Sequence, residues 1–128
     1  MYQAQVKAHF DSAHFLKGYK GKCEELHGHR FLVAVTIETS ELDEVGMSVD
    51  FGIMKKHLKE IVERLDHTNL NDVTPFDRIN PSSENIARHI FEEMKQKFVQ
   101  YIDSGAGKFS VKKVKIWESP DTWACYFE

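Results

Sequence analysis

The stretch that decides the fold is RFLVAVTIET at residues 30–39, in which every second side chain is large and apolar. These alternating residues are Phe31, Val33, Val35 and Ile37. A period of two residues, built from β-branched and aromatic side chains, is typical of a strand that buries one face. Residues 2–10 alternate in the same way and predict another half-buried strand, which comes before a loop rich in Gly and Lys.

Beyond residue 50 the apolar period changes to three or four residues, which indicates helices. Residues 53–65 carry one apolar stripe, with Asp50 as the N-cap. His57 is expected at the edge of the core on this helix, and His89 on the next helix is expected in solvent. The start of that next helix is indicated by the run Asn80-Pro81-Ser82-Ser83-Glu84.

The second helix is expected to continue to Gly105, after which the strand period returns. Residues 108–118 and 122–127 each predict a strand, and Ser119-Pro120-Asp121 predicts the turn between them. The order is therefore ββααββ. It predicts an α+β domain with a four-stranded antiparallel sheet and both helices on one face.

The composition limits the classes of protein to which the chain can belong. A length of 128 residues predicts one domain over residues 1–128, and 41% hydrophobic with 29% charged residues is typical of a globular chain. The net charge of −3 argues against a nucleic-acid partner, and no apolar run approaches the roughly 20 residues of a membrane span. The first residues lack the apolar core of a secretory signal, so we expect a cytoplasmic protein whose Cys23 and Cys125 are free thiols.

The densest polar cluster is Cys23-Glu24-Glu25-Leu26-His27-Gly28-His29, which leads into the strand at residues 30–39. Residues two apart on a strand point to the same face, so His27 and His29 can converge on one ion. His14, just beyond the strand at residues 2–10, adds a third imidazole if the two strands pair as a hairpin. Three neutral imidazoles with an open fourth position are typical of a catalytic zinc site, although histidines that only hydrogen-bond explain the same spacing.

Three further groups carry chemistry of interest, each with an ordinary alternative. A Cys23 thiol beside a cation could act as a base or nucleophile, whereas a lone Cys is usually a small buried residue. Asp66 and His67 could orient a proton transfer, or His67 could simply favour a helix C-terminus. Glu118 could grip a ring that presents an N–H and an amino group side by side, or it could be a solvated strand end.

Several short motifs occur in an order that resembles the 6-pyruvoyl-tetrahydropterin synthase family, including its bacterial branch, the 6-carboxy-tetrahydropterin synthases of queuosine synthesis. The matching motifs run from Phe10 to the C-terminus: Phe10-Asp11-Ser12-Ala13-His14, Cys23-x-x-x-His27-Gly28-His29, Val49-Asp50-Phe51-Gly52, Leu65-Asp66-His67-Thr68-Asn69-Leu70-Asn71, Asn80-Pro81-Ser82-Ser83-Glu84-Asn85 and the strand end at Glu118. The resemblance implies a tunnelling fold, in which subunits close a β-barrel as a homotrimer or homohexamer with active sites between subunits.

The resemblance also implies a zinc-dependent carbon–carbon lyase that acts on a small molecule, 7,8-dihydroneopterin triphosphate. His14, His27 and His29 would bind one Zn²⁺ per subunit, which would hold and polarise the substrate side chain as a Lewis acid. Cys23 would be the general base that removes a proton from a carbon of that side chain.

Further residues receive roles from the same resemblance. Asp66 and His67 would relay protons and would reach the site from a neighbouring subunit. Glu118 would anchor the pterin ring, with Glu84 as a second candidate at the ring pocket. Lys22 is assigned to the triphosphate by its charge and not by a motif.

The product stays open between related outcomes. The resemblance favours 6-carboxy-5,6,7,8-tetrahydropterin, released with acetaldehyde and triphosphate, over elimination of triphosphate alone to give 6-pyruvoyl-tetrahydropterin. Glu24 also completes Glu24-x-x-His27-Gly28-His29, which resembles a subgroup that cleaves dihydroneopterin for folate synthesis, although a surface acid would look the same. A hypothesis from a different class is a zinc-stabilised or pterin-binding module without catalysis.

Overall fold

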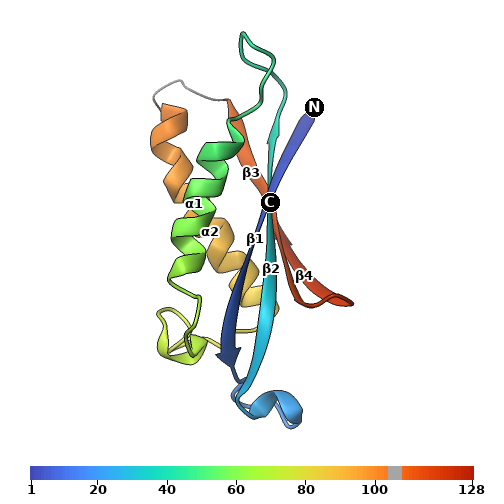
Figure 1. The fold of residues 1–128 in the computed structure, drawn as a ribbon, viewed down its shortest axis with the longest axis vertical. Coiled ribbons are helices and arrows are strands. Elements are labelled where there is room, and N and C mark those ends of the chain that lie inside the picture. The colour runs from blue at the N-terminus through green and yellow to red at the C-terminus, as the bar shows by residue number, and fades with distance from the viewer. Residues whose placement is uncertain (104–107) are drawn as a thin grey trace.

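The structure, a computed structural model, describes residues 1–103 and 108–128. It forms a four-stranded antiparallel sheet in the order β1-β2-β3-β4, and Figure 1 shows both helices on one side of that sheet. The main elements are, in chain order, β1 (Tyr2–His14), β2 (His27–Thr39), α1 (Phe51–Glu63), α2 (Ser83–Asp103), β3 (Phe109–Ser119) and β4 (Thr122–Phe127). The predicted ββααββ order and the α+β class are confirmed.

The β1–β2 hairpin is longer than the sequence predicted at the end that carries the histidines. Pairing runs without a break from Tyr2 opposite Thr39 to His14 opposite His27. The apolar alternation of β1 ends at Phe10, because the next residues on the core face are the polar and buried Ser12 and His14. The hydrophobic pattern therefore underestimates the strand, while the ladder of backbone hydrogen bonds continues.

The helices begin where the capping residues predict. The Asp50 carboxylate accepts a hydrogen bond from the Gly52 backbone N–H at 2.7 Å, which confirms Asp50 as the N-cap of α1. The predicted end of α2 at Gly105 lies outside the described residues. Within the described part of the chain, no helix combines the length and apolar character needed to cross a membrane.

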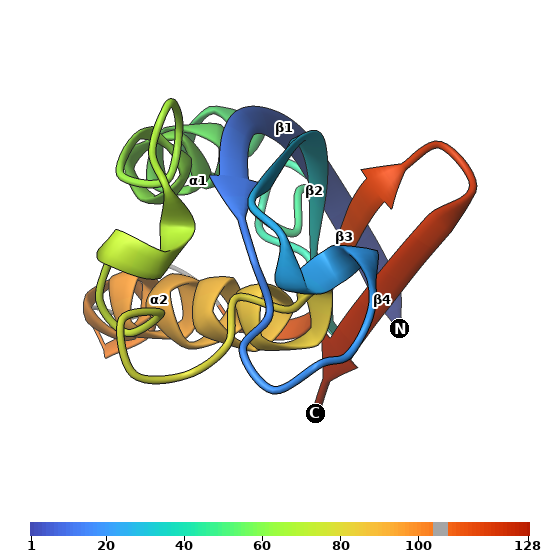
Figure 2. The ribbon, with the colours of Figure 1, turned by 90° about the horizontal axis from the view of Figure 1, so that it is seen from below.

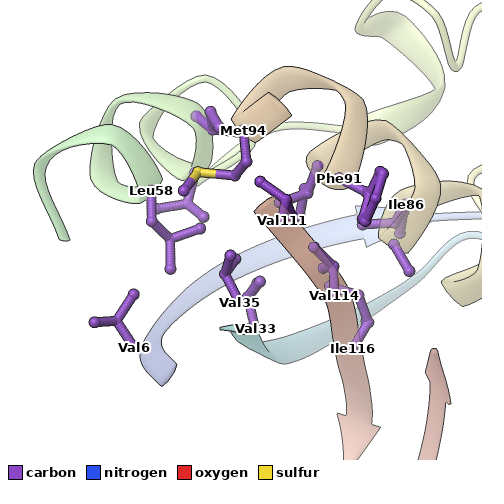
Figure 3. Packing of buried hydrophobic residues seen from close by; sticks show 14 of the residues in the cluster. Val6, Val33, Val35, Leu58, Ile86, Phe91, Met94, Val111, Val114 and Ile116 are labelled. Atoms are coloured by element: carbon purple, nitrogen blue, oxygen red, sulfur yellow. The ribbon is translucent and has the colours of Figure 1, made fainter. Parts of the chain in front are cut away.

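The core lies between the helices and the face of the sheet that they cover (Figure 3). The even-numbered residues of β1 and the odd-numbered residues of β2 point into it, as the period of two predicted. Its largest fully buried side chains include Phe10, Phe31, Phe76, Phe91, Phe98, Met54 and Leu58. Burial of this apolar surface against the two helices is what fixes their position.

The opposite side of the sheet, which we call the outer face, carries no helix in the described structure (Figure 1). By the strand register it presents Gln3, Gln5, Lys7, His9 and Asp11 from β1, Arg30, Leu32, Ala34, Thr36 and Glu38 from β2, Lys113, Lys115 and Trp117 from β3, and Trp123, Cys125 and Phe127 from β4. Ala34 and Thr36 are nevertheless buried, because they lie on an inner strand beneath longer neighbours such as Gln5, whose Nε2 donates to Thr36 Oγ1 at 2.9 Å.

The prediction that His89 lies in solvent is wrong. His89 is half-buried on α2, and its ring lies edge-on to Phe76 with 5.2 Å between the ring centroids. The irregular segment after α1 folds Phe76 back onto the helix, which the helical period alone does not reveal. His57 does lie at the edge of the core, edge-on to Phe98 at 5.3 Å.

We predict that His89 makes the fold less stable in mild acid. Burial disfavours the charged imidazolium and lowers the pKa of His89 below its usual 6.5. As the pH falls below about 6.5, the unfolded chain therefore takes up the proton first, and the free energy of unfolding falls until the folded state is protonated too. Urea unfolding of His89→Gln should show a weaker loss of stability from neutral to mildly acidic pH. Substitution of the exposed His9 by Gln is the control, and an equal change in both variants contradicts the prediction.

Candidate active site

Three histidines lie together on the core face, at the end of the β1–β2 hairpin. His14 is the last residue of β1 and faces His27, the first residue of β2, and His29 follows on the same face. One ring nitrogen from each of the three lies within 4.8 Å of the others, and the ring centroids are 4.5 to 5.3 Å apart. The structure thus brings together the three residues whose convergence was expected from hairpin pairing.

Backbone carbonyls orient two of these rings. His14 Nδ1 donates to the Pro81 carbonyl at 2.7 Å, and His27 Nδ1 donates to the Glu25 carbonyl at 2.7 Å. A neutral ring that donates from Nδ1 keeps a lone pair on Nε2, so these contacts select the tautomer in which Nε2 can bind a metal. His14 is 1% exposed, and its Nε2 is buried with no hydrogen-bond partner among the described residues.

The histidine cluster fits a divalent cation. Desolvation lowers the pKa of His14 and of His29, so both rings are neutral and free to donate a lone pair at neutral pH. An unpartnered buried ring nitrogen is costly unless something binds it. Three imidazoles that converge in this way are the donor set of a zinc site with one position left for water or substrate.

A pocket of about 320 Å³, which we call the front pocket, is connected to this cluster through its lining residue Glu118. Cys23 lies in it from η1 (Lys22–Glu24), Ser83 and Glu84 from the start of α2, and Glu118 and Trp123 from β3 and β4. Figure 2 shows η1, the start of α2 and the β3–β4 pair gathered at this end of the molecule. The structure therefore brings Cys23, Glu84 and Glu118 to one pocket, from three segments far apart in the sequence.

Glu118 connects the front pocket to the histidine cluster. Its Oε1 lies 3.9 Å from His14 Nε2, and the carboxylate is 31% exposed. Strand alternation turns Glu118 to the same side as the buried Ile116, and the β3–β4 register shifts between Trp117 and Ser119, next to it. Such irregularities commonly re-aim a side chain at the end of a sheet.

Two predicted residues are not placed in the front pocket. Glu24 is exposed in η1 beside Cys23, and it is absent from the described lining of that pocket. The side chain of Lys22 lies outside the described part of the structure.

The Asp66–His67 pair forms, but apart from the histidine cluster. Asp66 Oδ2 lies 2.9 Å from His67 Nδ1, and Asp66 Oδ1 accepts the Asp11 backbone N–H at 2.8 Å. The hydrogen bond from the Asp11 backbone, followed by that from His67, lowers the pKa of Asp66. The His67 side chain is 80% exposed and lines a shallow hollow in which His29 also lies.

Main-chain hydrogen bonds hold residues 65–68 against the end of β1. The His67 N–H donates to the Asp11 carbonyl at 2.7 Å, and the Ala13 N–H donates to the Thr68 carbonyl at 3.0 Å. The Ser12 hydroxyl donates to the Leu65 carbonyl. His67 adopts a φ of 55°, in the left-handed region that few residues other than glycine adopt.

Sequence reasoning missed the residues that orient the site. The Pro81 and Glu25 carbonyls leave no signal in side-chain patterns, because any residue supplies such an acceptor. The ion pair of Arg30 with Asp11, at 3.0 Å from Nε to Oδ1 and 3.2 Å from Nη2 to Oδ2, was also missed. The available signal was the opposite charges of Asp11 and Arg30 on the two strands. It predicts a contact only when both strands are extended to their true ends, which places the two residues opposite each other.

Comparisons with known proteins agree over nearly the whole chain. Residues 3–128 match the family model described as 6-pyruvoyl tetrahydropterin synthase. The chain is 31% identical to the 6-carboxy-5,6,7,8-tetrahydropterin synthase of Rickettsia bellii, over 100% of this chain and 99% of that one. It is 36% identical to the dihydroneopterin monophosphate aldolase of Pyrococcus furiosus, over 88% of this chain and 85% of that one. Among solved structures, the 6-pyruvoyl tetrahydropterin synthase of Caenorhabditis elegans matches with a TM-score of 0.84 and 26% identity, covering 99% of this chain and 95% of that one.

We predict that the protein stripped of metal binds one Zn²⁺ per chain at the histidine cluster. Replacing His29 by Ala removes one of three donors and should weaken zinc affinity by at least about a hundredfold, since each ligand contributes directly to the coordination. Competition with a chromogenic chelator measures this affinity. Substitution of the outer-face His9 by Ala is the matched control. Unchanged zinc affinity in His29→Ala would rule out the cluster as the metal site.

Proposed function

Because the chain belongs to the 6-pyruvoyl tetrahydropterin synthase family and is a lyase of that family, we propose that it is a zinc-dependent 6-carboxy-5,6,7,8-tetrahydropterin synthase. Its substrate would be 7,8-dihydroneopterin triphosphate, and its other products acetaldehyde and triphosphate. The similarity to the Rickettsia bellii enzyme over the full length of both chains supports this product.

The observation that carries the proposal is that the front pocket meets the histidine cluster at Glu118. A zinc ion bound by His14, His27 and His29 supplies Lewis-acid polarisation of the oxygens on the substrate side chain. Glu118 both lines the front pocket and lies 3.9 Å from His14 Nε2, so a ring held by this carboxylate extends its side chain toward the cluster.

Residues of the front pocket would bind the pterin ring and remove a proton from the substrate. The Glu118 carboxylate accepts from the N–H and amino groups of the pterin ring as a charge-assisted pair, with Glu84 at the same ring. Cys23 acts as the general base that takes a proton from the side-chain carbon. Lys22 is a candidate for the triphosphate on the strength of its charge.

Asp66 and His67 would complete the site of a neighbouring subunit by relaying protons. The 80% exposure of the His67 side chain supports this arrangement, because it leaves the imidazole free to reach a neighbouring copy. β1 and β4 are the edge strands of the described sheet, so each has one edge without a neighbouring strand in a single chain. Pairing of these edges between copies would close a barrel as a homotrimer or homohexamer. A cytoplasmic location and a role in queuosine synthesis belong to the same proposal.

A second candidate reaction is cleavage of a dihydroneopterin side chain to a 6-hydroxymethyl product. The similarity to the aldolase of Pyrococcus furiosus favours it, and Glu24 is the residue that would serve as its base. Elimination to 6-pyruvoyl-tetrahydropterin and a module that binds zinc and pterin without catalysis are the other outcomes that the assay distinguishes.

We predict that incubation with 7,8-dihydroneopterin triphosphate releases acetaldehyde together with 6-carboxy-5,6,7,8-tetrahydropterin, as identified by mass spectrometry. Cys23→Ala should lower this rate by at least about a hundredfold, because it removes the general base, while zinc content and folding are kept. Cys125→Ala, which changes the other cysteine, should leave the rate unchanged.

Other results of this assay decide among the alternatives. A 6-pyruvoyl product without acetaldehyde would replace the proposed reaction by simple elimination. A 6-hydroxymethyl product that disappears in Glu24→Gln would assign side-chain cleavage. If the zinc-loaded protein forms no product, the hypothesis that remains is a module that binds zinc and pterin without catalysis.

We predict that two inactive variants restore each other when their subunits are mixed. If Cys23 comes from one subunit and His67 from another, random assembly of Cys23→Ala with His67→Asn, which tolerates the positive φ at this position, leaves about one quarter of the sites intact. Mixing the unfolded variants in equal amounts, refolding them and measuring the turnover tests this. A mixture as inactive as its components would place Cys23 and His67 of one site in the same chain.

A further inference from the structure

The outer face of the sheet concentrates positive charge, although the chain as a whole carries −3. Lys7, Arg30, Lys113 and Lys115 all point to this face from three neighbouring strands. The acid among them is Asp11, which is paired with Arg30, while Glu38 lies toward the opposite end of the sheet. Cations gathered in this way attract an anion to the face that no helix covers.

Carboxylates do not neutralise these lysines. Lys7 Nζ and Lys115 Nζ lie 5.6 and 4.8 Å from the centroid of the Trp117 ring, and Lys115 Nζ lies 3.6 Å from the centroid of Trp123. Among the described residues, no carboxylate forms an ion pair with Lys7, Lys113 or Lys115. An ammonium group held over an indole keeps its whole charge, so it remains available to an anion.

Part of this charged face borders a hollow of about 730 Å³, which we call the outer hollow. Lys7, His9, Arg30 and Trp117 line it, and so does His29 from the histidine cluster. Gly28 has no side chain on the outer face, and the nearest atom to a Cβ built there is the Ser12 carbonyl oxygen at 3.8 Å. Gly28 also lines the outer hollow, so no side chain projects into the hollow from this position.

The outer hollow and the front pocket meet at Glu118, which lines both. They differ sharply in charge. The described lining of the front pocket contains two carboxylates, Glu84 and Glu118, and no Lys or Arg. A molecule with a ring at one end and several phosphates at the other would therefore place its ring in the front pocket and its phosphates in the outer hollow.

We propose that the outer hollow is the polyphosphate subsite, with Lys7 and Arg30 as its binding residues and Lys115 as a supporting cation. Asp11 occupies Nε and Nη2 of Arg30, which fixes the guanidinium and leaves Nη1 for a phosphate oxygen. The assignment of this subsite to the triphosphate of the substrate rests on the proposed function, whereas the anion site does not.

The test uses inorganic tripolyphosphate as the probe, titrated calorimetrically into the full-length protein at low salt. Lys7→Gln and Arg30→Gln should each weaken binding by about tenfold, since each removes a charge-assisted contact. Arg78→Gln and Lys59→Gln remove exposed charges of the same kind elsewhere and should leave the affinity unchanged. With 7,8-dihydroneopterin triphosphate as substrate, the KM of Lys7→Gln and Arg30→Gln should rise by about tenfold with little change in kcat, and their affinity for unphosphorylated dihydroneopterin should stay that of the wild type.

Failure of this inference is distinguishable from failure of the proposed function. Wild-type affinity for tripolyphosphate in both variants would overturn the subsite, as would a loss seen only in Lys22→Gln or no binding by the wild type. If binding depends on Lys7 and Arg30 while the wild type turns over no pterin triphosphate, the anion site stands and the proposed reaction falls.

Discussion

The pairing register of β1 with β2 is the constraint on which the rest of the site depends. Side chains alternate along a strand, so the register decides both the face on which a residue lies and its height along the sheet. With His14 opposite His27, three imidazoles share the core face, while Asp11 and Arg30 meet on the outer face three residues farther along the two strands. A slip of one residue would carry the ring of His14 to the outer face and separate it from the other two. The apolar residues farther along the same strands exclude that slip, because it would expose Phe10.

The sequence predicts most of the fold because its apolar residues recur with the simple periods of strands and helices. It predicts less where polar residues are buried. The apolar alternation of Phe31, Val33 and Val35 predicts β2, and the N-cap residue Asp50 predicts the start of α1. Both signals depend only on residues that are close together in the sequence. Ser12 and His14 belong to β1 but interrupt its apolar alternation, so the strand looked shorter than it is. His89 was predicted to be exposed because Phe76, which covers it, lies in a segment whose apolar residues follow no regular period. Of the site, the histidine triplet follows from the hairpin, whereas its Pro81 and Glu25 acceptors follow from tertiary structure alone.

Charge is separated across the thickness of this sheet. The core-face end holds the three imidazoles and the carboxylates of Glu84 and Glu118, and the outer face holds lysines over indole rings. A thin sheet keeps these two environments apart because a strand presents opposite faces with successive residues. Glu118 and Trp117 are adjacent in sequence, yet one faces the histidines and the other faces the lysines. The contrast between the two sides thus needs no separate domain, only alternation along β3.

The hydrogen bonds that hold residues 65–68 against the end of β1 have an evolutionary consequence. Two of its hydrogen bonds join main-chain atoms, at Asp11 with His67 and at Ala13 with Thr68. Bonds of this kind are indifferent to side-chain identity, so position 67 can be exchanged while the loop keeps its shape. Its left-handed backbone restricts that exchange to residues such as His, Asn, Asp or Gly, which tolerate a positive φ. The side chain at position 67 can therefore change in the course of evolution without any rearrangement of the sheet beneath it.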